Sequence, residues 1–99
     1  MPISSQRYWF NEANIRSIAP ARAGVYGLYD GNTTIYYGES LNIQDRLIEH
    51  LQGYSGRCTA NAESFNVEVR SNRKARERQL LVAHKAQTGS LPRCNDRIG

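Results

Sequence analysis

The chain has 99 residues, the length of one domain with a modest hydrophobic core and little room for a second. Its 13 Lys and Arg residues against 9 Asp and Glu give a net charge of +4. This balance favours a polyanionic partner only weakly, because many ordinary proteins share it. No run of about 18 apolar residues spans a membrane, and residues 1–16 lack the apolar centre of a secretory signal. We therefore expect an intracellular, cytoplasmic protein without a membrane partner.

The first 22 residues are expected to form an accessory segment ahead of a main domain at 23–99. Tyr8, Trp9 and Phe10 stand together, and residues 14–18 precede Pro20. This pattern predicts a short helix or an irregular cap whose aromatic side chains pack inward.

Residues 25–29 and 33–37 predict a β-hairpin, because two β-branched and aromatic runs flank an Asp-Gly turn. If Tyr26 lies directly opposite Tyr36, then Tyr29 pairs with Thr33 and the loop consists of residues 30–32. This register puts Tyr26 and Tyr36 on the same face of the hairpin. A two-residue loop would be expected to put them on opposite faces.

Two further helices and one strand are predicted downstream. Residues 42–51 indicate a helix with Asn42 as its N-cap, and residues 54–64 indicate a polar loop. The alternation of apolar and polar residues over 65–70 predicts a third strand with one buried face. Asn72 is expected to cap a last helix that runs to about Thr88, before Gly89 and Pro92.

Cys58 and Cys94 match no zinc-binding spacing. An intracellular setting disfavours a disulfide, so we expect two reduced, buried thiols.

Polar residues occupy positions on both long helices where apolar ones are expected. Arg46 and His50 are four residues apart and share a helical face with apolar residues. Glu77 lies on the same stripe as Leu80 and Leu81, so its carboxylate is aimed at the side of the helix that meets the sheet.

Each of these residues also has an ordinary explanation. Arg46 fits a surface ion pair with Asp45 or Glu49, and His50 fits a hydrogen-bonded histidine beside the core. Glu77 fits an exposed residue paired with Arg73 or Lys74, and tyrosines are common in strands. These explanations do not predict that all of them occur together and in this order.

Two triplets, Gly24-Val25-Tyr26 and Tyr36-Tyr37-Gly38, flank the turn, and the residues Ser40, Arg46, His50, Glu77 and Asn95 follow in that order. With this combination the chain from Gly24 to Asn95 resembles a GIY-YIG nuclease domain. That superfamily includes homing endonucleases, restriction enzymes and the incision subunit of bacterial excision repair. The resemblance implies an α+β fold with a three-stranded antiparallel sheet flanked by helices, which agrees with the order of the predicted elements.

The resemblance further implies a metal-dependent endonuclease that acts on DNA. Its catalytic residues would be Tyr26, Tyr36, Arg46, His50, Glu77 and Asn95. Glu77 would bind Mg²⁺ or Mn²⁺, an ion that stabilises charge on the phosphoryl oxygens and on the departing 3′ oxygen. The planar guanidinium of Arg46 would hold a phosphate oxygen, and Asn95 would orient a phosphate or a water.

The general base needs an additional group, because a phenol with an ordinary pKa near 10 is only about a thousandth ionised at pH 7. In some relatives a lysine follows the second triplet, whereas here Glu39 stands there and its charge acts in the wrong direction. We therefore assign Tyr26 as the general base, assisted by His50, and expect Tyr36 to position the water or phosphate.

Nucleic-acid contacts are expected from Arg46 and from Arg73, Lys74 and Arg76, which belong to a basic cluster at the start of the last helix. A solvated helix face explains about half of that cluster. Tyr54 fits a base-stacking residue as well as a packed one. We expect nicking by a monomer or homodimer with weak sequence or structure-based specificity. The alternatives are a catalytically inactive nucleic-acid-binding module and a protein-interaction domain.

Overall fold

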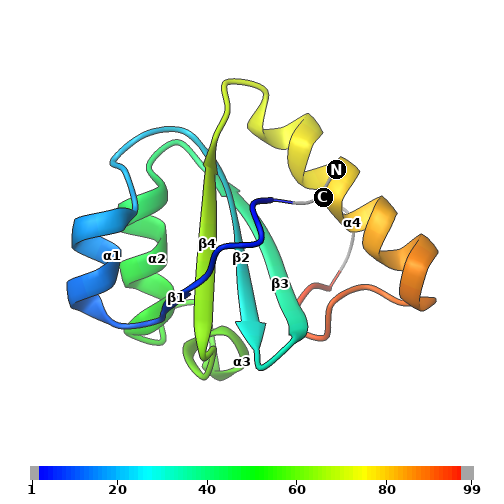
Figure 1. Cartoon of the computed structure of the whole chain (residues 1–99), viewed down its shortest axis with the longest axis horizontal. Coiled ribbons are helices and arrows are strands. Elements are labelled where there is room, and N and C mark those ends of the chain that lie inside the picture. Colours follow the sequence, from blue (N-terminus) through cyan, green and yellow to red (C-terminus); the bar gives the residue numbers. More distant parts are fainter. Residues whose placement is uncertain (1–2, 97–99) are drawn as a thin grey trace.

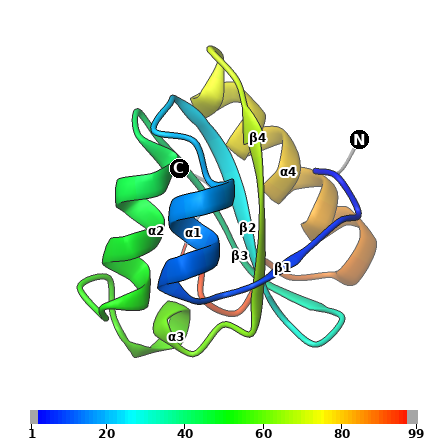
Figure 2. The ribbon, with the colours of Figure 1, turned by 60° about the vertical axis from the view of Figure 1, so that its left-hand side comes forward.

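The computed structural model describes residues 3–96 and shows an antiparallel sheet with helices on both faces (Figure 1). The strands are ordered β1 (Tyr8–Trp9), β4 (Ser64–Val69), β2 (Gly24–Asp30) and β3 (Thr33–Ser40). Helices α1 (Glu12–Ile18) and α2 (Ile43–Leu51) cover one face, and α4 (Arg73–Thr88) covers the other. The short helix α3 (Arg57–Ala60) lies beside α2 (Figure 2). The predicted α+β architecture is confirmed, but the sheet has four strands and not three.

The fourth strand comes from the segment that was expected to be a helix or an irregular cap. Tyr8 pairs with Phe65 and Trp9 with Ser64. Because side chains alternate along a strand, Phe10 is buried while Trp9 is 66% exposed, so the expectation that all three aromatics pack inward is wrong for Trp9. Phe10 and residues of α1 belong to the same core cluster as the main sheet. The domain boundary at residue 22 stays a prediction.

The hairpin is confirmed, but its register differs from the predicted one. Asp30 pairs with Thr33, so the loop has two residues, and Gly31 adopts a left-handed φ of 59° that glycine accommodates without strain. A β-bulge follows, in which Leu28 pairs with Tyr36 and Tyr29 with Thr34, leaving Ile35 as the extra residue. The two-residue loop alone would put Tyr26 and Tyr36 on opposite faces of the hairpin. The extra residue of the bulge shifts the pairing by one position and returns them to the same face. Tyr26 and Tyr36 therefore lie on the same face, as expected, although Tyr26 pairs with Gly38.

The predicted long helices are confirmed. The Asn42 side chain accepts a hydrogen bond from the Asp45 amide and begins α2. Asn72 stands at the N-cap position of α4 without a capping hydrogen bond from its side chain, and Gly89 ends α4 with a left-handed φ of 88°. No helix within residues 3–96 is long and apolar enough to cross a membrane.

Two expectations between α2 and α4 need correction. The polar segment 54–64 contains the short helix α3. Strand β4 does not have a single buried face, since Phe65 and Asn66 are both buried and Val69 is 40% exposed. The first half of the strand is enclosed on both faces, because Phe65 lies in the core beside α1 and α2 while Asn66 donates to the Ser4 carbonyl of the N-terminal segment on the other face.

A C-terminal segment runs along the free edge of β3. The Cys94 amide donates to the Ile35 carbonyl, and a disulfide joins Cys94 to Cys58 of α3. The expectation of two reduced, buried thiols is therefore wrong, and Cys58 is exposed. The cysteines are 36 positions apart in the chain, yet their Cα atoms are 5.7 Å apart, a proximity that only the folded topology creates.

Candidate active site

Two tyrosines from neighbouring strands form the floor of the candidate site. Tyr26 of β2 and Tyr36 of β3 face α2, with ring centroids 6.1 Å apart. Gly38 lies opposite Tyr26 on β3. A Cβ at this position would overlap both tyrosine rings, so the glycine of the second triplet makes room for the pair.

His50 places an imidazole directly against these tyrosines. It lies in the last turn of α2 and is 1% exposed. Its Nε2 is 2.7 Å from the Tyr26 hydroxyl, and its ring meets the Tyr36 ring edge-on at 5.1 Å. Burial, with a further contribution from the charge of Arg46, lowers the pKa of His50 to about 4. The imidazole is therefore neutral at neutral pH and is able to accept a proton.

Arg46 lies one turn before His50 and is about one third exposed. Its Nη1 forms an ion pair with Glu49 Oε1 at 3.0 Å, which is one of the ordinary pairs considered for it. The same guanidinium lowers the pKa values of Tyr26 and Tyr36. Burial outweighs this effect and raises both pKa values, so the two phenols are neutral at neutral pH.

Glu77 brings a half-buried carboxylate from α4 to the same site. Burial raises its pKa, the negative charge of Glu39 raises it further, and the Glu39 backbone amide opposes the shift. Its charge also raises the pKa of both Tyr26 and Tyr36. Among the described residues Glu77 forms no ion pair, so the expected surface pair with Arg73 or Lys74 is not found. A half-buried carboxylate without a cationic side chain suits a hard divalent cation.

Glu39 is directed away from the two tyrosines. It pairs with Val25 across the hairpin, which puts its side chain on the α4 side of the sheet. There Arg73 Nε lies 3.1 Å from Glu39 Oε1, in an ion pair that lacks hydrogen-bond alignment. Glu39, which stands where some relatives have a lysine, therefore raises the pKa of Glu77 and pairs with Arg73.

Asn95 lies on the outer edge of β3 and uses its amide on the backbone. Its Oδ1 accepts from the Tyr37 amide and its Nδ2 donates to the Tyr37 carbonyl, both at 3.0 Å. These bonds satisfy an edge strand, which is a structural role. The structure thus brings Tyr26, Tyr36 and His50 into contact, and the charges of Arg46 and Glu77 act on the two phenols. The catalytic roles of these residues and of Asn95 stay predictions.

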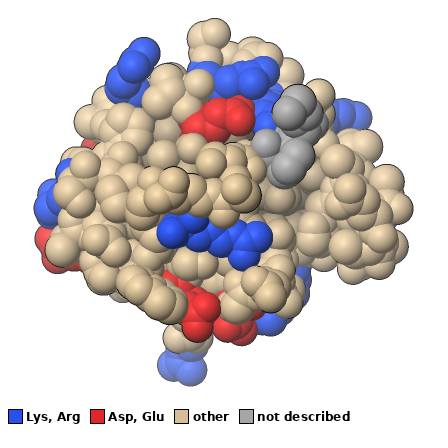
Figure 3. Space-filling view, viewed as in Figure 1, with Lys and Arg blue, Asp and Glu red and all other residues tan. Residues whose placement is uncertain are grey.

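The basic residues of α4 differ from one another in their surroundings. Arg76 is 4% exposed and donates to Glu68 through Nε at 2.7 Å and to Gln79 through Nη1 at 2.7 Å. The expectation that Arg76 contacts nucleic acid is corrected, because its guanidinium is buried and already paired. Lys74 is exposed. On the face shown in Figure 3, basic side chains stand in separate patches, some beside acidic ones.

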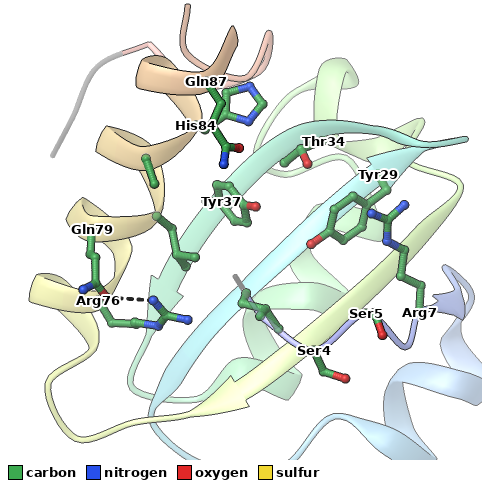
Figure 4. A pocket seen from close by; sticks show the side chains of 13 residues that line it. Ser4, Ser5, Arg7, Tyr29, Thr34, Tyr37, Arg76, Gln79, His84 and Gln87 are labelled. Carbon is green, nitrogen blue, oxygen red and sulfur yellow. Dashed lines mark hydrogen bonds between the residues drawn. The ribbon is translucent and has the colours of Figure 1, made fainter. Parts of the chain in front are cut away.

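A cavity of about 450 Å³ lies on the α4 side of the sheet, away from Tyr26 and His50 (Figure 4). Three of its polar or charged lining residues, Tyr29, Arg7 and Arg76, have partners. The Tyr29 hydroxyl donates to Asn66 at 2.9 Å, the Arg7 guanidinium stacks 3.7 Å above the Tyr29 ring, and Arg76 is bonded to Gln79. This pairing favours a structural role for the cavity lining.

Sequence reasoning missed one polar residue that touches the site. Thr59 of α3 is 3% exposed, and its hydroxyl lies 2.9 Å from His50 Nδ1. Nothing in its spacing marks it, because it belongs to a segment expected to be a polar loop. Tyr54 is 79% exposed, which excludes a role in the core.

A family model and several solved structures match this chain, and both point to the same kind of domain. The family model described as the GIY-YIG catalytic domain matches residues 22–89. The N-terminal GIY-YIG endonuclease domain of UvrC from Thermotoga maritima, bound to its catalytic cation magnesium, is similar with 25% identity and a TM-score of 0.54, over 83% of this chain and 96% of that one.

Two point mutants of the same Thermotoga maritima domain, each bound to its catalytic divalent cation, have the same fold. A tyrosine-to-phenylalanine mutant is 23% identical with a TM-score of 0.59. An asparagine-to-alanine mutant is 21% identical with a TM-score of 0.61. Each match covers 85% of this chain and 97% of the other. Since the family model spans most of the sequence and the two triplets build one site, the chain belongs to the GIY-YIG catalytic domain family.

Proposed function

We propose that this protein is a divalent-metal-dependent endonuclease that hydrolyses DNA phosphodiester bonds. The observation that carries the proposal is the buried 2.7 Å contact between the Tyr26 hydroxyl and His50 Nε2, beside Tyr36 and within reach of the charge of Arg46. Membership of a nuclease family supports the reaction class. The magnesium-bound relative supports the dependence on a metal.

The tyrosine and the histidine are proposed to act as a proton relay. A phenol with a raised pKa does not deprotonate by itself at neutral pH. As a water oxygen attacks phosphorus, the water proton passes to the Tyr26 oxygen and the Tyr26 proton passes to His50 Nε2. The bond between phosphorus and the 3′ oxygen breaks, and the 3′ oxygen takes a proton from a solvent water. His50 then returns its proton to Tyr26, which releases one to solvent. His50 is neutral at neutral pH, so one ring nitrogen is free to accept from the Tyr26 hydroxyl.

Arg46 and Tyr36 are proposed to bind the phosphate and the water. The Arg46 guanidinium is partly exposed and has donors beyond the one that contacts Glu49, so it can hold a phosphate oxygen. The Tyr36 hydroxyl positions the attacking water or a phosphate oxygen. Both side chains therefore orient the reacting groups around Tyr26.

Glu77 is the residue that would hold Mg²⁺ or Mn²⁺. Its half-buried carboxylate has no cationic partner among the described residues, and a second carboxylate, Glu39, lies close by. Magnesium commonly binds through one or two carboxylates and keeps several waters. When bound, the ion would neutralise charge on the phosphoryl oxygens and on the departing 3′ oxygen.

The substrate is proposed to be DNA, and each cutting event is proposed to break one strand. One set of reacting groups in one chain serves one phosphodiester bond, so a monomer nicks and only a homodimer would cut both strands together. Exposed cations such as Lys74 would contact the backbone without reading sequence. This arrangement suggests weak sequence specificity or recognition of DNA shape. An intracellular location stays a prediction, and the disulfide weakens its premise.

The proposal is tested by following cleavage of single-stranded, duplex and branched DNA with magnesium, with manganese and with a chelator. The wild type is compared with Glu77→Gln, which keeps the shape of the side chain but removes its charge. Glu12→Gln is the matched control, because Glu12 is exposed on α1 and, within residues 3–96, pairs only with Arg16.

Cleavage is expected to require the metal, to be lost in Glu77→Gln and to persist in Glu12→Gln. Cleavage that Glu77→Gln retains in full would contradict the assigned metal site. Salt-sensitive DNA binding by the wild type without cleavage in any metal would favour the catalytically inactive binding module.

A further inference from the structure

His50 is held from both sides. Its Nε2 lies 2.7 Å from the Tyr26 hydroxyl, and its Nδ1 lies 2.9 Å from Thr59 Oγ1. All three side chains are buried, with exposed fractions of 1% for His50, 0% for Tyr26 and 3% for Thr59. The Thr59 hydroxyl thus contacts the second nitrogen of the imidazole ring.

The ring contacts two hydroxyls, and because a phenol is a stronger hydrogen-bond donor than an alcohol, we assign Tyr26 as the donor and Thr59 as the acceptor. A buried phenol needs an acceptor for its proton, and His50 Nε2 is placed to be that acceptor. A neutral imidazole carries one proton, so an accepting Nε2 puts the proton on Nδ1. Nδ1 then donates to Thr59 Oγ1, which completes a chain from Tyr26 through His50 to Thr59.

Helix α3, which carries Thr59, has only four residues and lacks a side-chain N-cap bond. Such a short helix is not held by its own hydrogen bonds. The residue before Thr59 is Cys58, whose disulfide ties α3 to Cys94. Cys94 in turn donates its amide to Ile35 of β3, next to Tyr36. The disulfide therefore fastens Thr59 to the strand that carries one of the two tyrosines.

We propose that Thr59 is a positioning residue of this site: its hydroxyl keeps the His50 proton on Nδ1, so that Nε2 faces Tyr26 unprotonated, and the Cys58–Cys94 disulfide holds Thr59 in place. The effect on rate rests on the function proposed above. The effect on the His50 ring does not depend on it.

The position of the proton on the His50 ring is measured by nitrogen NMR of protein with isotope-labelled histidine rings, at neutral pH and without metal. The sequence has two histidines, so His84 serves as an internal reference. His50 of the wild type is expected to show the Nδ1–H form. Thr59→Val, which keeps the shape and removes the hydroxyl, is expected to give a mixture of the two forms. Thr59→Ser is expected to restore the wild-type signal.

The kinetic test uses the same variants. Loss of a partner that orients a histidine costs roughly tenfold or more in related settings. We expect about a tenfold lower kcat for Thr59→Val with little change in KM, and recovery in Thr59→Ser. The double variant Cys58→Ser with Cys94→Ser is expected to resemble Thr59→Val in its His50 signal and to lose part of kcat.

The outcomes separate this proposal from the proposed function. A wild-type His50 in the Nε2–H form would overturn the role of Thr59, whatever the activity and even if Thr59→Val fails to fold. A wild-type signal that persists in the double cysteine variant would overturn the role of the disulfide. Absence of cleavage by the wild type, with His50 in the Nδ1–H form, would refute the nuclease while the positioning by Thr59 stands.

Discussion

Two buried polar clusters lie on opposite faces of the sheet, and they differ in whether their protons can move. On the α2 side, Tyr26, His50 and Thr59 are linked by contacts of 2.7 and 2.9 Å. On the α4 side, Arg76 is bonded to Glu68 and Gln79. Each member of the first cluster can both donate and accept, whereas an arginine always stays charged and only donates.

This difference between the two clusters distinguishes a group suited to proton transfer from one that stabilises the fold. The α4 cluster is saturated, because three nitrogens of Arg76 have oxygen partners at 2.7 to 3.2 Å. It fixes the position of α4 without offering a group for a reaction. The α2 cluster is more deeply buried, with exposed fractions of 0 to 3%, and in the proposed relay a proton passes along it from Tyr26 to His50. Burial of a polar group is therefore no sign of catalysis by itself, and the type of partner decides.

The largest expected effect is on the α2 side, where substitution of His50 should lower the cleavage rate. His50→Ala is expected to lower kcat for DNA cleavage by about 10²- to 10⁴-fold, the usual contribution of an acid–base group. His84→Ala is the matched control, because His84 lies on α4 against Tyr37 and outside the site. The measurement is single-turnover cleavage with the metal in excess. Equal losses in the two variants would contradict the assignment of His50.

The next largest effect is expected on stability. Arg76→Met leaves Glu68 without its main partner, and we expect a loss of about 3 kcal/mol in the free energy of unfolding. The figure is at the low end for a buried pair because Glu68 is 24% exposed and also contacts Arg70. Denaturant unfolding measures the loss. The cleavage rate of the folded variant should be unchanged, and a large loss of rate at full folding would give the α4 cluster a part in the chemistry.

A third prediction concerns the pH dependence of stability. Burial and the charge of Arg46 lower the pKa of His50 from 6.5 to about 4, so between these values the unfolded chain binds a proton that the folded chain does not. The free energy of unfolding therefore falls as pH decreases from 6.5 to 4, by about 1.4 kcal/mol per pH unit from this group.

The measurement compares wild type with His50→Gln over this range without metal, so that the contributions of other groups cancel. The difference between the two proteins should decrease steadily toward pH 4. A constant difference would show that His50 titrates normally and is not enclosed as described.

The smallest effect distinguishes two cations of the same helix. Lys74 is exposed and Arg76 is buried. Lys74→Ala is expected to reduce the salt slope of duplex DNA binding by about 0.9, the value for one phosphate contact. Arg76→Met should leave the slope unchanged. Binding titrations at several salt concentrations test both, and a change caused only by Arg76→Met would contradict the assigned surroundings of the two residues.

Local patterns predicted much of the fold, while the membership of the site stays a prediction. The turn at Asp30 and Gly31, the cap at Asn42 and the end of α4 at Gly89 each depend on a few neighbouring residues. Helical periodicity predicted that Glu77 faces the sheet, and in the structure its carboxylate is half-buried and raises the pKa of Tyr26.

The remaining features depend on contacts between distant segments. Pairing of Tyr8 with Phe65 creates β1, and the disulfide joins residues 36 positions apart. The contact of Thr59 with His50 and the pairing of Arg76 with Glu68 need the assembled sheet and helices. The bulge at Ile35 changed the register while keeping both tyrosines on one face, an outcome that side-chain alternation alone does not reveal.

The central claim is that the buried Tyr26–His50 pair performs metal-dependent hydrolysis of DNA. The most direct test is the rate at which wild type and Tyr26→Phe nick supercoiled circular DNA in magnesium. Phenylalanine keeps the ring and removes only the hydroxyl that meets His50. Open circles are expected with the wild type, and a rate lower by about 10²-fold or more is expected with Tyr26→Phe. Equal nicking by the two proteins would contradict it.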